Sequence, residues 1–162
     1  MTITIIKDFL DKNLLDTINQ RVFSQDFPWY WRDAMVSNDH YWFNHTFYKD
    51  GKILSPHYSE WIEPILKKLD CKTLIGARCN MNTKERTSYT SVLHTDFKLP
   101  NVKTSLLYLN TCNGGTVVAD QGKEKYIKSE ENKIIIFPCK TLHRGVGQTD
   151  VIRRAVININ YA

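Results

Sequence analysis

The stretch HTDFKLPNVKTSLLYLN, residues 94–110, places a histidine and an aspartate two positions apart, ahead of an apolar run that ends near a tyrosine. Residues i and i+2 of an extended strand point to the same side of a sheet, so His94 and Asp96 would present their side chains together. An imidazole and a carboxylate on one face are suited to holding one metal ion. Chance also produces such pairs, so the metal hypothesis needs a further ligand.

A second histidine downstream supplies that ligand. The apolar run NKIIIFP, residues 132–138, leads into CKTLHRGVG, where we expect His143 in a short loop at the end of a strand. Two histidines and one carboxylate form the facial arrangement that binds non-haem Fe(II) and leaves coordination positions free. The sequence therefore predicts a metal site made of His94, Asp96 and His143.

The C-terminal run IRRAVININY, residues 152–161, is expected to form a strand with an arginine on each face. Arg153 shares its face with three apolar residues, which indicates that this face is buried. A buried guanidinium is costly unless it meets an anion, and no nearby sequence feature obviously supplies one. We therefore expect Arg153 to bind a carboxylate of a ligand. Arg154, on the more polar face, is the second choice.

Short strands separated by turn residues fill the sequence beyond residue 72. The expected strands are residues 73–81, 91–96, 103–109, 115–119, 124–128, 132–138 and 152–161. Seven short strands within about ninety residues are typical of a sandwich, jelly roll or barrel.

The first 72 residues have a different pattern. A short strand over residues 2–6 precedes a helix over residues 8–23, whose N-cap is Asp8 or Asp11. A second helix begins at Ser55-Pro56, and Pro64 is expected to kink or split it.

An aromatic block, residues 27–48, separates the two expected helices. We interpret its rings mainly as packing between the helices and the β-rich half, with a substrate platform as the alternative. The sequence thus predicts a single domain over residues 1–162, in which residues 1–72 form a helical and aromatic support region and residues 73–162 form the β core.

The composition fits a folded globular protein, with 42% hydrophobic and 24% charged residues. The formal net charge of +5 is spread along the chain, so it favours an anionic partner only weakly. Four cysteines without a C-x-x-C pair indicate reduced thiols. The apolar N-terminal run is too short for a signal peptide or a membrane span, so we expect a cytoplasmic protein with no membrane partner.

The sequence resembles the iron(II)- and 2-oxoglutarate-dependent oxygenases, in particular their prolyl-4-hydroxylase-like branch. The resemblance is carried by a combination of motifs: HTD, YLN, NGG, IIIFP-x-x-x-LHRG and the later Arg153. The resemblance covers residues 73–161. The small size and the aromatic N-terminal part are also similar to oxygenases encoded by bacteriophages, which would place the protein in the host cytoplasm. The resemblance implies a mainly β fold with N-terminal helices, the double-stranded β-helix (jelly roll, cupin-like).

The resemblance also implies roles for individual residues. His94, Asp96 and His143 match the metal triad, Arg153 matches the residue that pairs with the distal carboxylate of 2-oxoglutarate, and Tyr108 matches a tyrosine that hydrogen-bonds the same carboxylate. Asn80 and Asn82 are further candidates for contacts with the co-substrate or the substrate. Collagen-type prolyl hydroxylases resemble this pattern but carry a lysine where Arg153 stands, which argues against a collagen-like substrate.

The implied reaction is hydroxylation of an unactivated C–H bond, for example in a prolyl or other peptide side chain, with O2 as co-substrate, release of succinate and CO2, and support from ascorbate. Two alternatives stay open. A nucleic-acid demethylase of the same superfamily would usually carry a second arginine six residues after the first, where this chain has Ile159. A non-catalytic jelly-roll module would use the same cavity to bind a sugar or a small acid.

Overall fold

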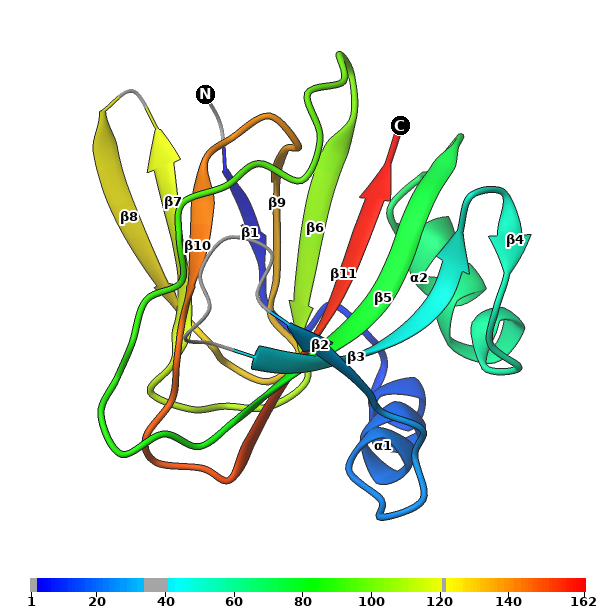
Figure 1. Cartoon of the computed structure of the whole chain (residues 1–162). Coiled ribbons are helices and arrows are strands. Elements are labelled where there is room, and N and C mark those ends of the chain that lie inside the picture. Colours follow the sequence, from blue (N-terminus) through cyan, green and yellow to red (C-terminus); the bar gives the residue numbers. More distant parts are fainter. Residues whose placement is uncertain (1–2, 34–40, 121) are drawn as a thin grey trace.

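The structure, a computed structural model, describes residues 3–33, 41–120 and 122–162 of the 162-residue chain. The described residues form two antiparallel sheets that face each other, with the helices on the far side of the larger one (Figure 1). The large sheet has the strand order β1 (Thr4–Ile6), β9 (Ile134–Pro138), β6 (Lys103–Tyr108), β11 (Arg153–Tyr161), β5 (Leu74–Thr83), β3 (Tyr41–Lys49) and β2 (Tyr30–Asp33), with β4 (Lys52–Ile53) paired to β3.

The small sheet has the order β10 (His143–Val146), β7 (Gly115–Asp120) and β8 (Lys123–Lys128). The segment between β5 and β6 runs along the free edge of β10, where isolated bridges join Thr90 to Val146 and His94 to His143. Of the strand that was expected over residues 91–96, only the bridge at His94 is formed.

The two faces of the large sheet differ in what they bury, and β11 shows the division clearly. Its helix face carries Ala155, Ile157, Ile159 and Tyr161, which join the core packed against the helices. Its inner face, which looks toward the small sheet, carries Arg154, Val156, Asn158 and Asn160. The terms helix face and inner face are used below for the whole sheet.

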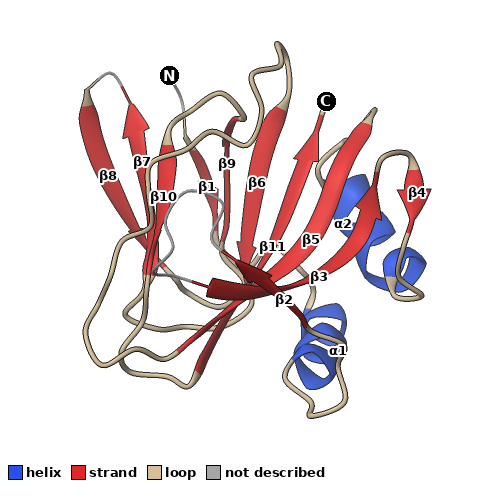
Figure 2. Ribbon diagram, viewed as in Figure 1, coloured by secondary structure: helices blue, strands red, loops and turns tan. Residues whose placement is uncertain are grey.

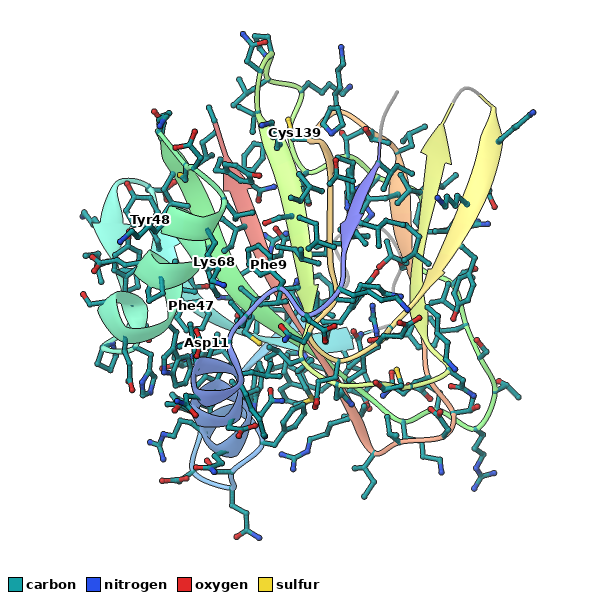
Figure 3. All side chains as sticks on the ribbon, turned by 180° about the vertical axis from the view of Figure 1, so that it is seen from behind. Phe9, Asp11, Phe47, Tyr48, Lys68 and Cys139 are labelled. Atoms are coloured by element: carbon teal, nitrogen blue, oxygen red, sulfur yellow. The ribbon has the colours of Figure 1, made fainter. Side chains whose placement is uncertain are left out.

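The helix face is covered by α1 (Lys12–Val22), a π-helical turn (Tyr58–Ile62) and α2 (Glu63–Lys68). Asp11, labelled at the start of α1 in Figure 3, is the N-cap of this helix, and its carboxylate accepts a hydrogen bond of 3.0 Å from the Leu14 amide. Pro64 lies in the first turn of α2, so the expected second helix is split at that point. Among the described residues, no helix has the length and apolar character that a membrane span requires.

The inner face packs against the small sheet through a second apolar cluster. This cluster consists of Leu106, Tyr108, Val118, Ile127, Ile135, Phe137 and Val156. Each sheet alone would leave one apolar face in water, so pairing the two sheets is what makes this half stable.

The mainly β fold with N-terminal helices, a double-stranded β-helix, is confirmed, as the predominance of antiparallel strands in Figure 2 shows. Two local expectations were wrong. The first 72 residues do more than support the β core, since β1, β2, β3 and β4 all join the large sheet. His143 is the first residue of strand β10 and does not lie in a loop. Residues 34–40 of the aromatic block lie outside the described residues.

Candidate metal and co-substrate site

The structure brings His94, Asp96 and His143 together between the two sheets. One ligand atom from each of the three side chains lies within 4.8 Å of the other two. The two histidines are held by a reciprocal backbone pair, in which the His94 amide donates to the His143 carbonyl at 3.0 Å and the His143 amide donates back at 2.9 Å. This backbone pair fixes the two imidazoles side by side, with ring centroids 4.5 Å apart.

Both imidazoles are oriented with Nε2 toward the centre of the triad. Nδ1 of His94 lies 3.0 Å from the Val92 carbonyl oxygen, and Nδ1 of His143 lies 3.0 Å from that of Thr141. A carbonyl oxygen can only accept a hydrogen bond, so in each neutral ring the proton sits on Nδ1 and the lone pair on Nε2 faces a metal. Burial lowers the pKa of His143 despite the opposing effect of Asp96, which favours the neutral ring that a metal needs.

Asp96 is held in place by three donors from the inner face of the large sheet. Its Oδ2 accepts from Thr104 Oγ1 at 3.0 Å, Asn160 Nδ2 at 2.9 Å and Asn158 Nδ2 at 3.3 Å. These contacts all converge on one oxygen, so Oδ1 remains available as a ligand. Such supporting hydrogen bonds fix the orientation of a metal-binding carboxylate.

The other oxygen of Asp96 faces the rest of the site. Oδ1 lies 3.8 Å from Nε2 of His143 and 3.5 Å from a guanidinium nitrogen of Arg78. Burial raises the pKa of this carboxyl, but His143, Arg78 and the hydrogen-bond donors together outweigh burial and hold the pKa below its ordinary value. Asp96 is therefore ionised at neutral pH.

The two neighbouring arginines of β11 point in opposite directions, and the expectation for Arg153 was wrong. Its side chain lies on the helix face, where it donates a hydrogen bond of 2.8 Å to the carbonyl oxygen of Phe23 and stacks on the Phe23 ring. The face shared with Ala155 and Ile157 is indeed buried, but it is buried against the helices. The anion that we expected for Arg153 is replaced by a helix C-terminal carbonyl oxygen.

Arg154 is the arginine that faces the triad side of the sheet. Its side chain is buried, its guanidinium lies 5.6 Å from the centroid of the Tyr108 ring, and it donates 3.0 Å to the Gly115 carbonyl. Its Nε is buried and has no hydrogen-bond partner. A buried cation with a donor left over is suited to binding an anion.

Tyr108, which the resemblance matched to a carboxylate-binding tyrosine, lies beside Arg154 on the inner face. It is fully buried, and its hydroxyl donates to Thr116 Oγ1 at 2.9 Å. Burial raises the pKa of Tyr108 to about 12, so its hydroxyl stays protonated and can donate. We call Arg154, Tyr108 and Thr116 the carboxylate cradle.

The two asparagines predicted on β5 also lie on the inner face. Asn82 is paired in register with Arg154, and its amide donates 3.0 Å to the hydroxyl of Tyr89. Asn80 has a buried side-chain oxygen without a partner. Sequence reasoning missed Tyr89, which packs so closely over Gly147 that any side chain there would overlap its ring. Gly147 was visible in the sequence, but nothing there connected it to a tyrosine 58 positions earlier.

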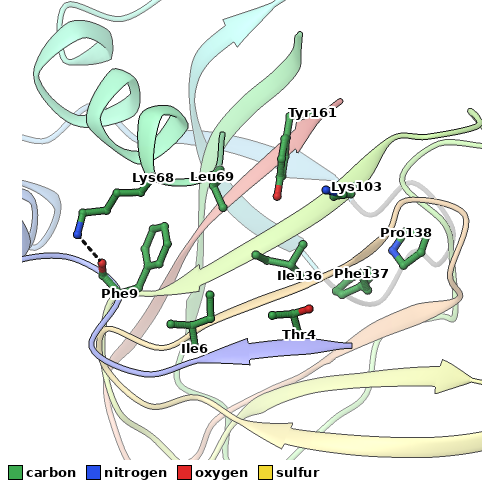
Figure 4. Close-up of a pocket in the computed structure, with 10 residues that line it drawn as sticks. All are labelled: Thr4, Ile6, Phe9, Lys68, Leu69, Lys103, Ile136, Phe137, Pro138 and Tyr161. Atoms are coloured by element: carbon green, nitrogen blue, oxygen red, sulfur yellow. Dashed lines mark hydrogen bonds between the residues drawn. The ribbon is translucent and has the colours of Figure 1, made fainter. Parts of the chain in front are cut away.

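A separate cavity of about 300 Å³ lies on the helix face of the large sheet (Figure 4). It is lined by side chains that include Ile6, Phe9, Lys68, Lys103 and Tyr161. The sheet itself stands between this cavity and the triad, so the cavity is not part of the candidate site.

No known family model and no curated protein sequence matches the chain. Solved structures do. A prolyl hydroxylase from Trichoplax adhaerens, in complex with a peptide fragment of the hypoxia inducible factor oxygen degradation domain, matches with a TM-score of 0.72 and 15% identity, over 98% of this chain and 83% of the other.

Two bacterial structures are similarly close. A 2OG-Fe(II) oxygenase family oxidoreductase from Burkholderia pseudomallei matches with a TM-score of 0.75 and 14% identity, over 98% of this chain and 84% of the other. A Pseudomonas putida prolyl-4-hydroxylase matches with a TM-score of 0.69 and 12% identity, over 98% of this chain and 91% of the other. The chain therefore has the fold of the 2-oxoglutarate- and iron(II)-dependent oxygenases, including their prolyl-hydroxylase members.

Proposed function

We propose that this protein is an Fe(II)- and 2-oxoglutarate-dependent dioxygenase that hydroxylates an unactivated C–H bond. The observation that carries the proposal is that His94, Asp96 and His143 lie together on the side of the large sheet, its inner face, that also carries Arg154 and Tyr108 of the cradle. Two imidazoles with free Nε2 atoms and one ionised carboxylate are the donor set that suits Fe(II). The fold shared with known oxygenases supports the same assignment.

In this proposal the cradle binds the distal carboxylate of 2-oxoglutarate. Arg154 supplies the charge and its unused Nε donor, while the neutral Tyr108 hydroxyl supplies a second donor once it turns from Thr116. Apolar side chains of the inner cluster surround the cradle and exclude water from it. Iron, when bound, would supply the activation of O2 that is coupled to conversion of 2-oxoglutarate into succinate and CO2.

For the substrate, we retain a prolyl or other peptide side chain as the working hypothesis. Its support is the similarity to two prolyl hydroxylases, one of them bound to a peptide. Fold similarity at this level of identity is compatible with other substrates, because substrate contacts lie in loops and edge strands that vary most.

The first test is an anaerobic titration of the apoprotein with Fe(II) and then with 2-oxoglutarate, following the visible charge-transfer band of the chelated co-substrate. We expect a band in the wild type and none in His143→Ala. Arg154→Gln should require about 10 to 100 times more 2-oxoglutarate, because hydrogen bonds to a charged group contribute about 1.5 to 3 kcal/mol. Arg153→Gln is the matched control and should titrate like the wild type.

Two outcomes would contradict the proposal. A folded wild-type protein without any band would show that the triad does not hold iron and 2-oxoglutarate together. A larger loss of affinity in Arg153→Gln than in Arg154→Gln would show that the co-substrate lies elsewhere.

A further inference from the structure

The inner face of the large sheet continues beyond the triad as a polar surface. Strand register aligns Asn80 of β5 with Asn44 of β3, and Asn44 with Tyr30 of β2. Residues two positions away on each strand share this face. We define the polar floor as Tyr30, Arg32, Trp42, Asn44, Arg78 and Asn80.

The charged side chains of the polar floor are Arg32 and Arg78, and both are cationic. Within the described inner face of β2, β3 and β5 there is no acidic side chain. Arg32 is oriented over the floor, because its Nε donates a hydrogen bond of 3.1 Å to Asn44 Oδ1. Within the part of the chain that the structure describes, this is the hydrogen bond that orients the Arg32 side chain, and its guanidinium has further donors that could reach a ligand on the floor.

Within the polar floor, Arg78 is the residue that contacts the triad. Its side chain is 41% exposed, and its nearest charged partner is Asp96 Oδ1 at 3.5 Å. That distance is long for a bidentate pair, and Oδ1 is the atom left over for a metal. A metal ion bound to Asp96 Oδ1 would neutralise the carboxylate that Arg78 now faces, which would leave the Arg78 guanidinium available to another anion.

The charges in a site that holds both the metal and 2-oxoglutarate also leave room for a further anion. The 2+ charge of the metal and the 2− charge of 2-oxoglutarate cancel, and Arg154 is balanced by Asp96. Arg78 and Arg32 then have no counter-charge among the described residues of the inner face of β2, β3 and β5. Guanidinium groups bind carboxylate or phosphate through charge-assisted hydrogen bonds, often two in parallel.

Side-chain amides on the floor and beside it add acceptors to these donors. The side-chain oxygen of Asn80 on the floor, and that of Asn158 on β11, which is paired in register with Arg78, are buried and have no partner. Buried polar atoms without a partner are costly, and at a binding surface they are satisfied by a ligand. The floor therefore offers cationic donors at its two ends and acceptors between the triad and Asn44.

We propose that the polar floor binds an anionic group of the substrate, a carboxylate or a phosphate, with Arg78 as the ligand nearest the metal and Arg32 as the second. The inference rests on the proposed function, because it treats the floor as the substrate side of the same site. It assigns the substrate to the anion-bearing compounds and places the reacting C–H bond within reach of that anion.

The test uses Mn(II) at the triad, saturating 2-oxoglutarate and low ionic strength, with inorganic phosphate and acetate as separate probes. Bound Mn(II) speeds the NMR relaxation of nuclei that approach it, so the 31P signal of phosphate and the 13C signal of acetate report anions on the floor. We expect enhanced relaxation of at least one probe in the wild type. The affinity for that probe should fall about tenfold in Arg78→Gln and by less in Arg32→Gln, as expected for removing a charged hydrogen bond. The probe whose relaxation is enhanced more shows whether the floor prefers phosphate or carboxylate.

Arg21→Gln is the matched control, since Arg21 lies on α1 and pairs with Asp26 at 2.7 Å on the far side of the sheet. It should relax the probes like the wild type. Mn(II) occupancy, read from the free-ion EPR signal, and 2-oxoglutarate affinity are measured for every variant. Both should be retained in Arg78→Gln and Arg32→Gln.

The possible failures are distinguishable. Wild-type protein that does not bind Mn(II) and 2-oxoglutarate overturns the proposed function and this inference with it. Normal loading with equal relaxation in the wild type and Arg78→Gln overturns the inference alone. A loss of 2-oxoglutarate affinity in Arg78→Gln also overturns it, because Arg78 would then belong to the co-substrate site.

Discussion

The helix face and the inner face of the large sheet are made by the same strands and have opposite characters. Ile157 and Ile159 on the helix face are fully buried among apolar side chains from both helices. Asn158 and Asn160, their immediate neighbours, are also buried but direct their amides at Asp96. One face is built for stability, and the other accepts buried polar groups in order to hold a site.

This difference has an energetic side. Burying an aliphatic side chain contributes about 1.5 to 3 kcal/mol, whereas a buried polar group stabilises little even when it is satisfied and costs stability when it is not. The inner face keeps several such groups, including the unpartnered oxygens of Asn80 and Asn158 and Nε of Arg154. The helix face must therefore supply much of the stability that the inner face gives up.

The largest expected effect compares neighbours on β11. Ile157→Ala should lower the free energy of unfolding by about 2 to 5 kcal/mol, because it leaves a cavity in the helix-face core. Asn158→Ala should cost no more than about 1.5 kcal/mol, since its one long hydrogen bond is all that it loses. Urea unfolding of the apoprotein measures both. Equal losses would show that the two faces do not divide stability and function in this way.

The second effect compares Thr104 and Ser105, which are adjacent on β6. Thr104→Val removes a donor to Asp96 and should weaken Fe(II) or Mn(II) binding by about 10 to 100 times, as is typical for groups that orient a metal ligand. Ser105→Ala removes only a long contact of 3.4 Å on the helix face and should leave metal affinity unchanged. Metal titration under anaerobic conditions gives both values. A similar loss in the two variants would mean that Thr104 acts through stability alone.

Local patterns predicted a β-rich core and the grouping of the three triad residues, while the choice of a double-stranded β-helix among sandwich, jelly roll and barrel came from the family resemblance. Period-two spacing placed His94 and Asp96 together, and the apolar strand before Pro138 led directly to His143. Predictions of this kind do not depend on where the boundaries of each strand are drawn. Even the misassignment of His143 to a loop did not affect its position in the site, because the backbone pairing with His94 fixes it.

The sequence could not decide which arginine faces the site. Alternation shows that Arg153 and Arg154 point to opposite faces, and the apolar companions of Arg153 correctly indicated a buried face. They did not indicate which of two buried faces it was, because a sheet covered on both sides is apolar in both directions. The polar companions Asn158 and Asn160 were the better guide, since they support Asp96 across the sheet.

The smallest expected effect compares two buried tyrosines on opposite faces. Burial raises the pKa of both Tyr108 and Tyr161 to about 12, so both hydroxyls are neutral. The two tyrosines differ chiefly in the face of the sheet on which they lie. Tyr108→Phe removes one neutral donor from the carboxylate cradle and should weaken 2-oxoglutarate binding by about 2 to 10 times, corresponding to about 0.5 to 1.5 kcal/mol. Tyr161→Phe should leave that affinity unchanged, because its ring borders the cavity on the helix face.

Both tyrosine variants can be followed by the charge-transfer titration, with urea unfolding as a check that neither has lost its fold. An unchanged affinity in Tyr108→Phe would show that its hydroxyl keeps its bond to Thr116 when 2-oxoglutarate is present. The carboxylate would then be held by Arg154 without Tyr108, and the tyrosine would serve only as the ring on which the guanidinium stacks.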